Sequence, residues 1–369
     1  MGMPSQYSAL INGRFMGVPI TGVQRFAREI LLALDATLPQ QRPGARLLLA
    51  VPQGILRTPQ AMFFEHIDLV EVGQRQGHAW EQLELARFRP ELPLFSLCNT
   101  APVWRRGQRV VIHDAAVFSL PQAYSWKFRA AYKAMHHGLA RTGAKILTVS
   151  EFSRQDLARH LHLPAQAIGV LPESGEHMQR LAADDSVLDQ HQLRQRPFVL
   201  AVSSNHLGKN FAFVAQALLQ LSEQHGPPDF DVVVAGGSNS AVFAQRGTDL
   251  PPFIKRVGYV SDEQLRSLYQ HAACFVFPSV YEGFGLPPLE AMSLGCPVLA
   301  ADAASIPEVC GEAAIYFNPQ QASSFTQALQ RVMMANNEQK QAWRQRSLQH
   351  SQQWTWARAA RALLQHMEV

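Results

Sequence analysis

The nine residues EGFGLPPLE (282–290) describe a turn from a strand into a helix. They follow an apolar run, residues 273–278, which is short enough for a buried strand of a parallel sheet. Gly283 and Gly285 allow a sharp turn and a close approach of the backbone to a ligand. The two prolines suit the start of a helix, where a missing N–H costs little. The sequence therefore predicts a strand, a turn and a helix of about two turns, in an α/β fold.

The same stretch has the chemistry of a ligand site. The unpaired N–H groups and the positive dipole end of the helix face the loop and favour a phosphate. We expect Glu290 in the first helical turn, where its oxygens could accept hydrogen bonds from a ribose diol. We expect Glu282 at the carboxyl end of the strand, where ligands of open α/β sheets bind. Spacing alone leaves open that both acids only cap and solvate the turn.

Two glutamates separated by seven residues around GFGLP resemble the donor-site signature of the retaining family-4 glycosyltransferases, and the similarity continues through residues 294–319. The resemblance implies the GT-B architecture: two facing Rossmann-like domains with parallel sheets, and a C-terminal helix that crosses back to the first domain. It also implies that Glu290 holds the donor ribose and that Glu282 lies at the donor sugar as a catalytic residue. The donor-binding residues between them would be Gly283, Phe284, Gly285 and Leu286.

Length and composition fit two domains. The chain has 369 residues, of which 47% are hydrophobic and 17% charged, enough for two α/β cores. Residues 178–196 are polar with few apolar positions, which predicts the boundary between the two domains there. We expect an acceptor-side domain over 1–177, a linker over 178–196, a nucleotide-sugar domain over 197–350 and a helix over 351–369 that packs back on the first domain.

Cysteine use and charge bear on location and partners. The four cysteines are scattered, which favours reduced core thiols and a cytoplasmic protein. No apolar run approaches the ~18 residues that span a bilayer, and no basic segment followed by an apolar one opens the chain. Residues 1–175 carry a net charge of +7 and the remainder −3. A basic first half could face nucleic acid, anionic lipid or a phosphorylated acceptor; no nucleic-acid motif supports the first.

Two loops of the first domain contain candidate site residues. A helix is expected to begin near Thr21 after a glycine-bearing loop, and from the residues alone this loop could be only a tight turn. The resemblance places it beside the donor phosphates, with Gly22 as a donor-site residue and Arg25 as a weaker one. VVIHD (110–114) ends a buried strand, where an isolated histidine would usually be structural. The resemblance instead implies that His113 reaches the donor sugar as a catalytic residue. Asp114 is a neighbouring candidate, with orientation of the loop backbone as its alternative role.

Residues 123–145 form a basic stretch that is rich in aromatic side chains and has no acidic residue. Such a helix could lie on an anionic membrane surface, at the inner face of the plasma membrane. It could equally be an ordinary helix packed through its aromatic stripe. Precedent in the family for lipid-linked acceptors favours the membrane.

In the second domain the loop SSNHLGKN (203–210) precedes a helix. Lys209 would add a positive charge to the backbone donors at a phosphate site, with Asn210 beside it, although a surface lysine is the alternative. The family often has an arginine a few residues earlier; here Ser203, Ser204 and Asn205 stand there, so His206 or a distant arginine would have to compensate.

Two further segments are compared with the family. Tyr259 and Val260 are expected to meet the nucleobase through their backbone. In PESGEHM (172–178), Ser174 and His177 depart from the family pattern, so we predict no ligand role there beyond a hinge at Gly175.

The IHD segment (112–114) and the overall pattern most resemble bacterial mannosyltransferases of polysaccharide assembly. This resemblance implies a retaining glycosyltransferase that moves a sugar, mannose from GDP-mannose as the first choice, to a saccharide or lipid-linked acceptor of bacterial surface polysaccharide. No Asp-x-Asp cluster is present, so we expect no metal or other cofactor, with fixed donors stabilising the leaving diphosphate. The alternatives are a nucleotide-sugar epimerase or hydrolase on the same fold and a non-catalytic nucleotide-binding scaffold. A dehydrogenase is disfavoured because no G-x-G-x-x-G follows the first strand.

Overall fold

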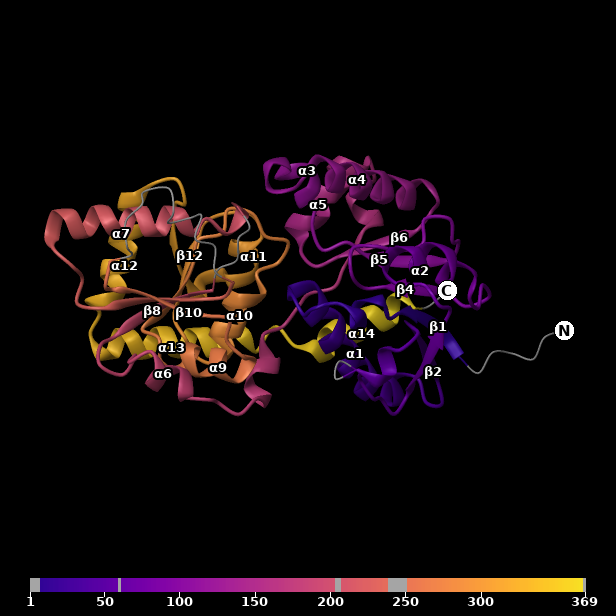
Figure 1. The fold of residues 1–369 in the computed structure, drawn as a ribbon, viewed down its shortest axis with the longest axis horizontal. Coiled ribbons are helices and arrows are strands. Elements are labelled where there is room, and N and C mark those ends of the chain that lie inside the picture. Colours follow the sequence, from indigo (N-terminus) through magenta and orange to yellow (C-terminus); the bar gives the residue numbers. More distant parts are fainter. Residues whose placement is uncertain (1–6, 59–60, 203–206, 238–250, 368–369) are drawn as a thin grey trace. The chain divides into compact units, whose positions relative to one another are not determined.

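The computed structural model describes residues 7–58, 61–202, 207–237 and 251–367. The chain divides into two compact units (Figure 1). Unit 1 comprises Met1–Glu173 and Trp356–Val369, and unit 2 comprises Ser174–Thr355. Residues 178–196, expected as a linker, belong to unit 2 and contain helix α6 (Ser186–Gln190). Val187, Leu188 and Leu193 in this stretch are buried, which explains why a polar stretch is nonetheless packed.

Unit 1 is built on a seven-stranded sheet in the order β3-β2-β1-β4-β5-β6-β7, and every pairing is parallel. Its central strands are apolar and buried, as expected for a parallel sheet covered on both faces. The strands are β1 (Tyr7–Asn12), β2 (Arg46–Pro52), β3 (Ile67–Val72), β4 (Leu94–Ser96), β5 (Gln108–Val111), β6 (Lys145–Thr148) and β7 (Gly169–Val170).

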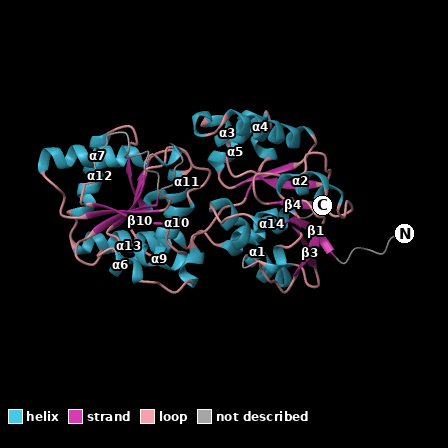
Figure 2. Cartoon of the chain, in the orientation of Figure 1, coloured by secondary structure: helices cyan, strands magenta, loops and turns pink. Residues whose placement is uncertain are grey.

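Helices cover both faces of this sheet (Figures 1 and 2). They are α1 (Gly22–Gln41), α2 (Gly77–Leu83), α3 (Ala116–Ser119), α4 (Trp126–Arg141), α5 (Glu151–Leu161) and α14 (Trp356–His366). The C-terminal helix α14 returns to this unit and packs on α1, where the buried Trp356 ring meets Phe26 at 6.0 Å between centroids. Arg42 also donates to the carbonyl oxygen of Leu364 at 3.0 Å. The expected return of the C-terminal helix to the first domain is therefore confirmed.

Unit 2 has a six-stranded parallel sheet in the order β10-β9-β8-β11-β12-β13. Its strands are β8 (Phe198–Val202), β9 (Asp231–Ala235), β10 (Ile254–Gly258), β11 (Cys274–Phe277), β12 (Val298–Ala301) and β13 (Ala314–Phe317). Figure 1 shows α7 and α12 on one face of this sheet and α6, α9 and α13 on the other. Besides α6, the helices of unit 2 have these bounds: α7 (Phe211–His225), α9 (Asp262–His271), α10 (Leu286–Ser293), α11 (Ile306–Cys310), α12 (Ala322–Met333) and α13 (Asn337–Ser351).

Candidate active site

The chain order of unit 2 reverses between β8 and β11, which are neighbours in the sheet. Ligands of open α/β sheets bind at the carboxyl ends of the strands at such a switch point. Lys209 follows β8 and Glu282 follows β11. Lys209 Nζ lies 2.8 Å from Glu282 Oε1, and the two side chains are 26% and 16% exposed. Two predicted site residues that are 73 positions apart therefore form one charged pair at the switch point.

The loop between Glu282 and α10 is held by its backbone. Gly285 caps the helix with φ +115°, a conformation that favours glycine. The hydroxyl of Ser305 donates to the carbonyl oxygens of Glu282 (2.9 Å) and Phe284 (2.7 Å). Phe284 and Leu286 are 3% and 6% exposed, so their side chains belong to the core. Along with Gly283, these residues can therefore offer a ligand mainly backbone groups. Ser305 was missed, because a single serine at a short helix has no spacing that marks it.

Glu290 is the fifth residue of α10, so it lies past the first helical turn in which it was expected. Because Gly285 is the cap, α10 begins at Leu286 and has no acidic residue in its first turn. The expectation that the helix dipole acts on Glu290 from the first turn is therefore wrong. Instead, Glu290 is 8% exposed and accepts hydrogen bonds from other side chains. His177 Nε2 lies 3.1 Å from Oε1, and the hydroxyl of Tyr269 donates to Oε2 at 3.3 Å.

The remaining predicted residues of unit 2 lie at the same sheet edge, since all strands are parallel. Asn210 caps α7 in the left-handed region, with φ +50°. Tyr259 and Val260 follow β10; Tyr259 is 86% exposed and Val260 is half-buried. Residues 203–206, which contain the expected substitutes for a family arginine, lie outside the described residues.

In unit 1, Gly22 is the exposed first residue of α1, and Thr21 forms a capping box with Gln24. A Cβ at Gly22 would meet no atom within 4 Å, so the fold of unit 1 does not require glycine there. Arg25 lies in the first turn of the same helix. The structure thus leaves Gly22 accessible at the start of a helix, as a backbone donor to phosphate would need to be.

His113 follows β5 and is buried, 4% exposed. Its Nδ1 lies 3.2 Å from Glu173 Oε1 and its Nε2 lies 3.0 Å from the carbonyl oxygen of Leu97. The ring also meets Phe26 edge to face at 4.8 Å. Both ring nitrogens therefore have partners within unit 1, and Glu173 is a partner that sequence reasoning did not identify. The carboxylate of Asp114 accepts from the backbone N–H of Ala116 at 2.8 Å, which fits its alternative role in orienting the loop.

Comparisons with known proteins identify the family to which the chain belongs. Residues 196–335 match the family model of glycosyl transferases group 1. O-antigen chain mannosyltransferase B of Escherichia coli is 34% identical over 92% of this chain and 93% of its own length. The chain belongs to the group 1 glycosyltransferases. O-antigen chain mannosyltransferase RfbU of Salmonella typhimurium is 26% identical over 63% of each chain. Sucrose-phosphate synthase from Thermosynechococcus elongatus superposes with a TM-score of 0.73 at 17% identity, over 97% of both chains. The fold is therefore GT-B, as the resemblance implied.

The glycosyltransferase also has a buried acid at the switch point of unit 1, between β1 and β4. Glu81 accepts from Asn12 Nδ2 (2.6 Å) and Thr100 Oγ1 (2.9 Å), and Arg14 Nε lies 3.3 Å away. Burial alone would raise the pKa of Glu81, but His78, Arg14 and these hydrogen bonds together lower it. A charged, fully buried carboxylate therefore fixes Arg14 at the edge of the sheet where ligands of this fold class bind.

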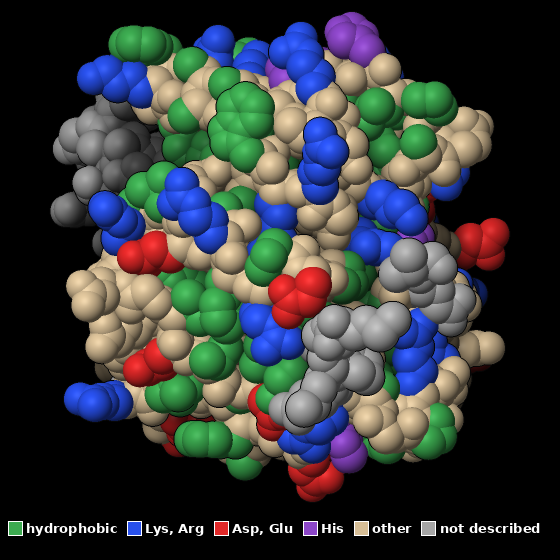
Figure 3. Space-filling view, turned by 90° about the vertical axis from the view of Figure 1, so that its right-hand side faces the viewer, with side chains coloured by type: hydrophobic (Ala, Val, Ile, Leu, Met, Phe, Trp, Pro, Cys, Tyr) green, Lys and Arg blue, Asp and Glu red, His purple; other side chains and the backbone are tan. Residues whose placement is uncertain are grey.

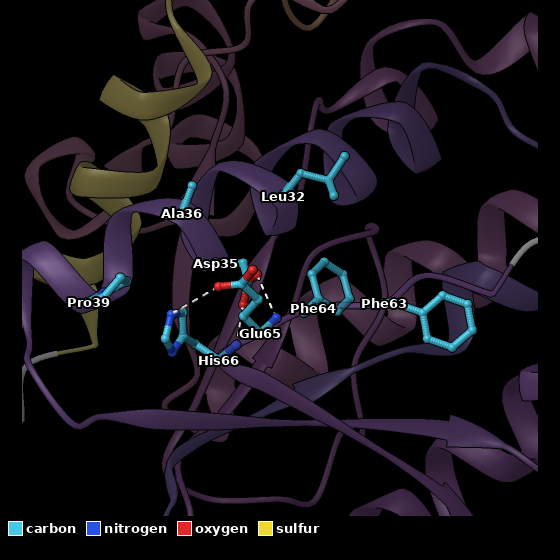
Figure 4. A pocket seen from close by; sticks show the side chains of 8 residues that line it. All are labelled: Leu32, Asp35, Ala36, Pro39, Phe63, Phe64, Glu65 and His66. Atoms are coloured by element: carbon cyan, nitrogen blue, oxygen red, sulfur yellow. Dashed lines mark hydrogen bonds and ion pairs between the residues drawn. The ribbon is translucent and has the colours of Figure 1, made fainter.

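A pocket of about 480 Å³ in unit 1 lies away from these residues (Figure 4). It is formed by α1 and residues 63–66, and Asp35 lies at its centre. The Asp35 carboxylate accepts the backbone N–H groups of Glu65 (2.9 Å) and His66 (2.7 Å). The Asp35 carboxylate therefore stabilises the loop that contains residues 63–66. None of the predicted site residues of the glycosyltransferase lines this pocket.

Over the described part of the chain, no helix of the glycosyltransferase is long and apolar enough to cross a membrane. Within the same residues, no group of three or more His, Cys, Asp or Glu side chains is placed to hold a metal ion. All four cysteines are free, and three of them are buried.

Proposed function

We propose that this glycosyltransferase transfers mannose from GDP-mannose to a saccharide or lipid-linked saccharide of bacterial surface polysaccharide, with retention of the anomeric configuration. The names of both relatives, O-antigen chain mannosyltransferases, support the donor sugar and the pathway. The resemblance of the Glu282 to Glu290 stretch to retaining enzymes supports the stereochemistry.

The observation that carries the proposal is the Lys209–Glu282 pair at the switch point of unit 2. A nucleoside diphosphate brings several negative charges, which compete with Glu282 for the Lys209 ammonium. Once Lys209 binds phosphate, the Glu282 carboxylate is released toward the donor sugar. The backbone N–H groups at the start of α10 would add fixed donors for the departing diphosphate. Stabilising the leaving group in this way lowers the barrier to transfer, and by family analogy the diphosphate accepts the acceptor's proton on the same face of the sugar.

Calorimetric titration with GDP, UDP, dTDP and ADP tests the donor site. The wild type is expected to bind GDP with micromolar affinity, and Glu290→Ala to lose most of that affinity because it removes the ribose acceptor. If none of the four nucleotides binds to the folded protein, the proposal of a nucleotide-sugar donor fails, and a non-catalytic scaffold becomes the better hypothesis.

Turnover of Lys209→Ala and Glu282→Ala tests the pair itself. Each variant is expected to lose about 10²–10³-fold in kcat, the usual effect of removing one electrostatic stabiliser of a transition state. The double variant should lose little more than either single variant, because the two residues act as a unit. His225→Ala, an exposed change in α7, is the control. Unchanged turnover in both single variants would show that the site lies elsewhere.

We propose that the reaction needs no metal ion, because Lys209 and the start of α10 can offset the diphosphate charge. Activity should survive treatment with a chelator. Loss of activity with chelator and its return with Mn²⁺ or Mg²⁺ would overturn this.

We propose that the enzyme is cytoplasmic and binds peripherally to the inner face of the plasma membrane through residues 123–145. In α4, Trp126 is 71% exposed, beside Lys127, whose ammonium lies 5.8 Å from the indole. Figure 3 shows Lys and Arg side chains among hydrophobic ones in the upper part of the view, whereas the acidic side chains lie in its middle and lower parts. Flotation with vesicles containing anionic lipid should depend on the anionic fraction and fall in Trp126→Ser/Lys127→Glu. No dependence on anionic lipid would remove the proposal.

A further inference from the structure

The segment that follows Glu173 is clamped to helix α10. A Cβ at Gly175 would lie 2.3 Å from the carbonyl carbon and oxygen of Leu289 and 2.4 Å from the backbone nitrogen of Glu290, so the two backbones are in direct contact. The hydroxyl of Ser293 donates to the carbonyl oxygen of Gly175 at 3.0 Å. Gln179 Nε2 donates to the carbonyl oxygen of Ser293 at 2.8 Å. The 3₁₀ helix η6 (Glu176–Arg180) is therefore fixed on α10 by a backbone contact and by two side-chain hydrogen bonds to carbonyl oxygens.

This clamp brings His177 to the Glu290 carboxylate. The His177 side chain is 3% exposed and that of Glu290 is 11% exposed, and the Nε2 to Oε1 distance is 3.1 Å. On the other side, the hydroxyl of the fully buried Tyr269 donates to Oε2. Burial and the Glu290 carboxylate raise the pKa of Tyr269, so the phenol keeps the proton that it donates.

Each carboxylate oxygen of Glu290 thus receives one donor from a buried side chain. An unrestrained glutamate side chain has three rotatable bonds, and fixing it when a ligand binds costs rotamer entropy. Here His177, Tyr269 and the packing of α10 fix the carboxylate in advance. A carboxylate has about four acceptor positions, so accepting these two donors is compatible with accepting the two hydroxyls of a vicinal diol.

We propose that His177 is a positioning residue, which together with Tyr269 holds the Glu290 carboxylate in the orientation that binds the ribose hydroxyls of the nucleotide donor. The inference rests on the proposed function, because it requires a ribonucleotide ligand. The inference assigns a role to the segment PESGEHM (172–178), which departs from the family pattern at His177. His177 also lies 113 positions before Glu290 in the sequence, so no motif spacing could have paired them.

The test uses GDP and 2′,3′-dideoxy-GDP, which lacks both ribose hydroxyls, in calorimetric titration of the full-length protein. For the wild type, GDP is expected to bind about 10- to 100-fold more tightly than the dideoxy compound, since two hydrogen bonds to a carboxylate are lost. In His177→Ala this ratio should fall to about threefold or less, with affinity for the dideoxy compound kept within about twofold. Tyr269→Phe, which removes only the hydroxyl, should lower the ratio by about threefold. His177→Asn, which keeps a donor, should recover part of the ratio, and the exposed change His225→Ala should leave it unchanged.

The outcomes separate this inference from the function on which it rests. A wild-type ratio in both His177→Ala and Tyr269→Phe overturns the positioning role. An equal loss of affinity for both compounds overturns it as well, because the residue would then support the fold and not the carboxylate. A wild type that binds both compounds equally overturns the inference and leaves nucleotide binding intact. A folded wild type that binds neither overturns the proposed function itself.

Discussion

Each unit of this glycosyltransferase contains a buried histidine–glutamate pair, and the two pairs differ in which member was predicted as a site residue. In unit 1 the predicted site residue is the histidine, His113, and the unforeseen partner is Glu173. In unit 2 the predicted residue is the acid, Glu290, and the unforeseen partner is His177. Both partners come from the one segment PESGEHM, on either side of the division between the units.

The environments of the two pairs differ. The His113 ring lies between two acceptors, the Glu173 carboxylate and the carbonyl oxygen of Leu97. A carbonyl oxygen only accepts, so Nε2 donates to Leu97. For His113 to donate to a donor sugar, one of these bonds would have to be exchanged. The Glu290 carboxylate instead lies between two donors and remains an acceptor. The two pairs therefore differ in their contacts: the His113 ring has an acceptor at each nitrogen, whereas the Glu290 carboxylate has a donor at each oxygen.

The largest expected effect comes from breaking the unit 1 pair. Glu173→Ala leaves His113 without its carboxylate in a buried site, and removing one partner of a buried pair costs about 3–5 kcal/mol of folding free energy. His177→Ala should cost unit 2 less, about 1–3 kcal/mol, because Tyr269 still donates to Glu290. Hydrogen exchange followed in peptides of each unit measures both changes separately. Glu65→Ala is the control, since that side chain is 89% exposed. A larger loss in His177→Ala than in Glu173→Ala would reverse the comparison.

The second effect is the response of unit 1 to acid. Burial lowers the pKa of His136 from 6.5 to about 4, with its Nε2 3.1 Å from the carbonyl oxygen of Asn99. Folded His136 stays neutral while the unfolded chain takes up a proton below pH 6.5, so the stability of unit 1 falls as pH falls from 6.5 to about 4. By pH 4 this difference in proton binding has lowered the free energy of unfolding by about 3 kcal/mol.

Below pH 4, His136 is protonated in the folded and the unfolded chain alike, so it no longer changes the free energy of unfolding with pH. Hydrogen exchange in unit 1 peptides at pH 7, 6 and 5 should report the fall, and His136→Gln, which keeps a donor for Asn99, should flatten it. A pH response that is identical in His136→Gln and wild type would assign the acid sensitivity to other groups of unit 1.

Sequence alone predicted what depends on neighbouring residues. The strand, glycine turn and helix around residues 282–290 follow from local conformational preferences. Lys209 and Glu282 were each predicted in the donor site, but their ion pair was not predicted. The prediction that Glu290 lies in the first turn of its helix was wrong, because the cap depends on the backbone angle of Gly285. Glu173 and His177 could not be assigned, since their partners lie 60 and 113 positions away and are brought close only by packing.

The smallest of the three effects tests whether the clamp at Gly175 is what distinguishes the unit 2 pair. A methyl group at this position would overlap the backbone of α10, which cannot rotate away as a side chain could. Gly175→Ala should therefore cost unit 2 about 1–3 kcal/mol and move η6 away from α10. Because His177 is part of η6, the preference for GDP over its dideoxy analogue should fall with it. Gly237→Ala is the matched control, as a Cβ there meets no atom within 4 Å. If Gly175→Ala lowered stability but kept the full preference, His177 would be held to Glu290 by its own hydrogen bond, and the clamp would be no more than packing.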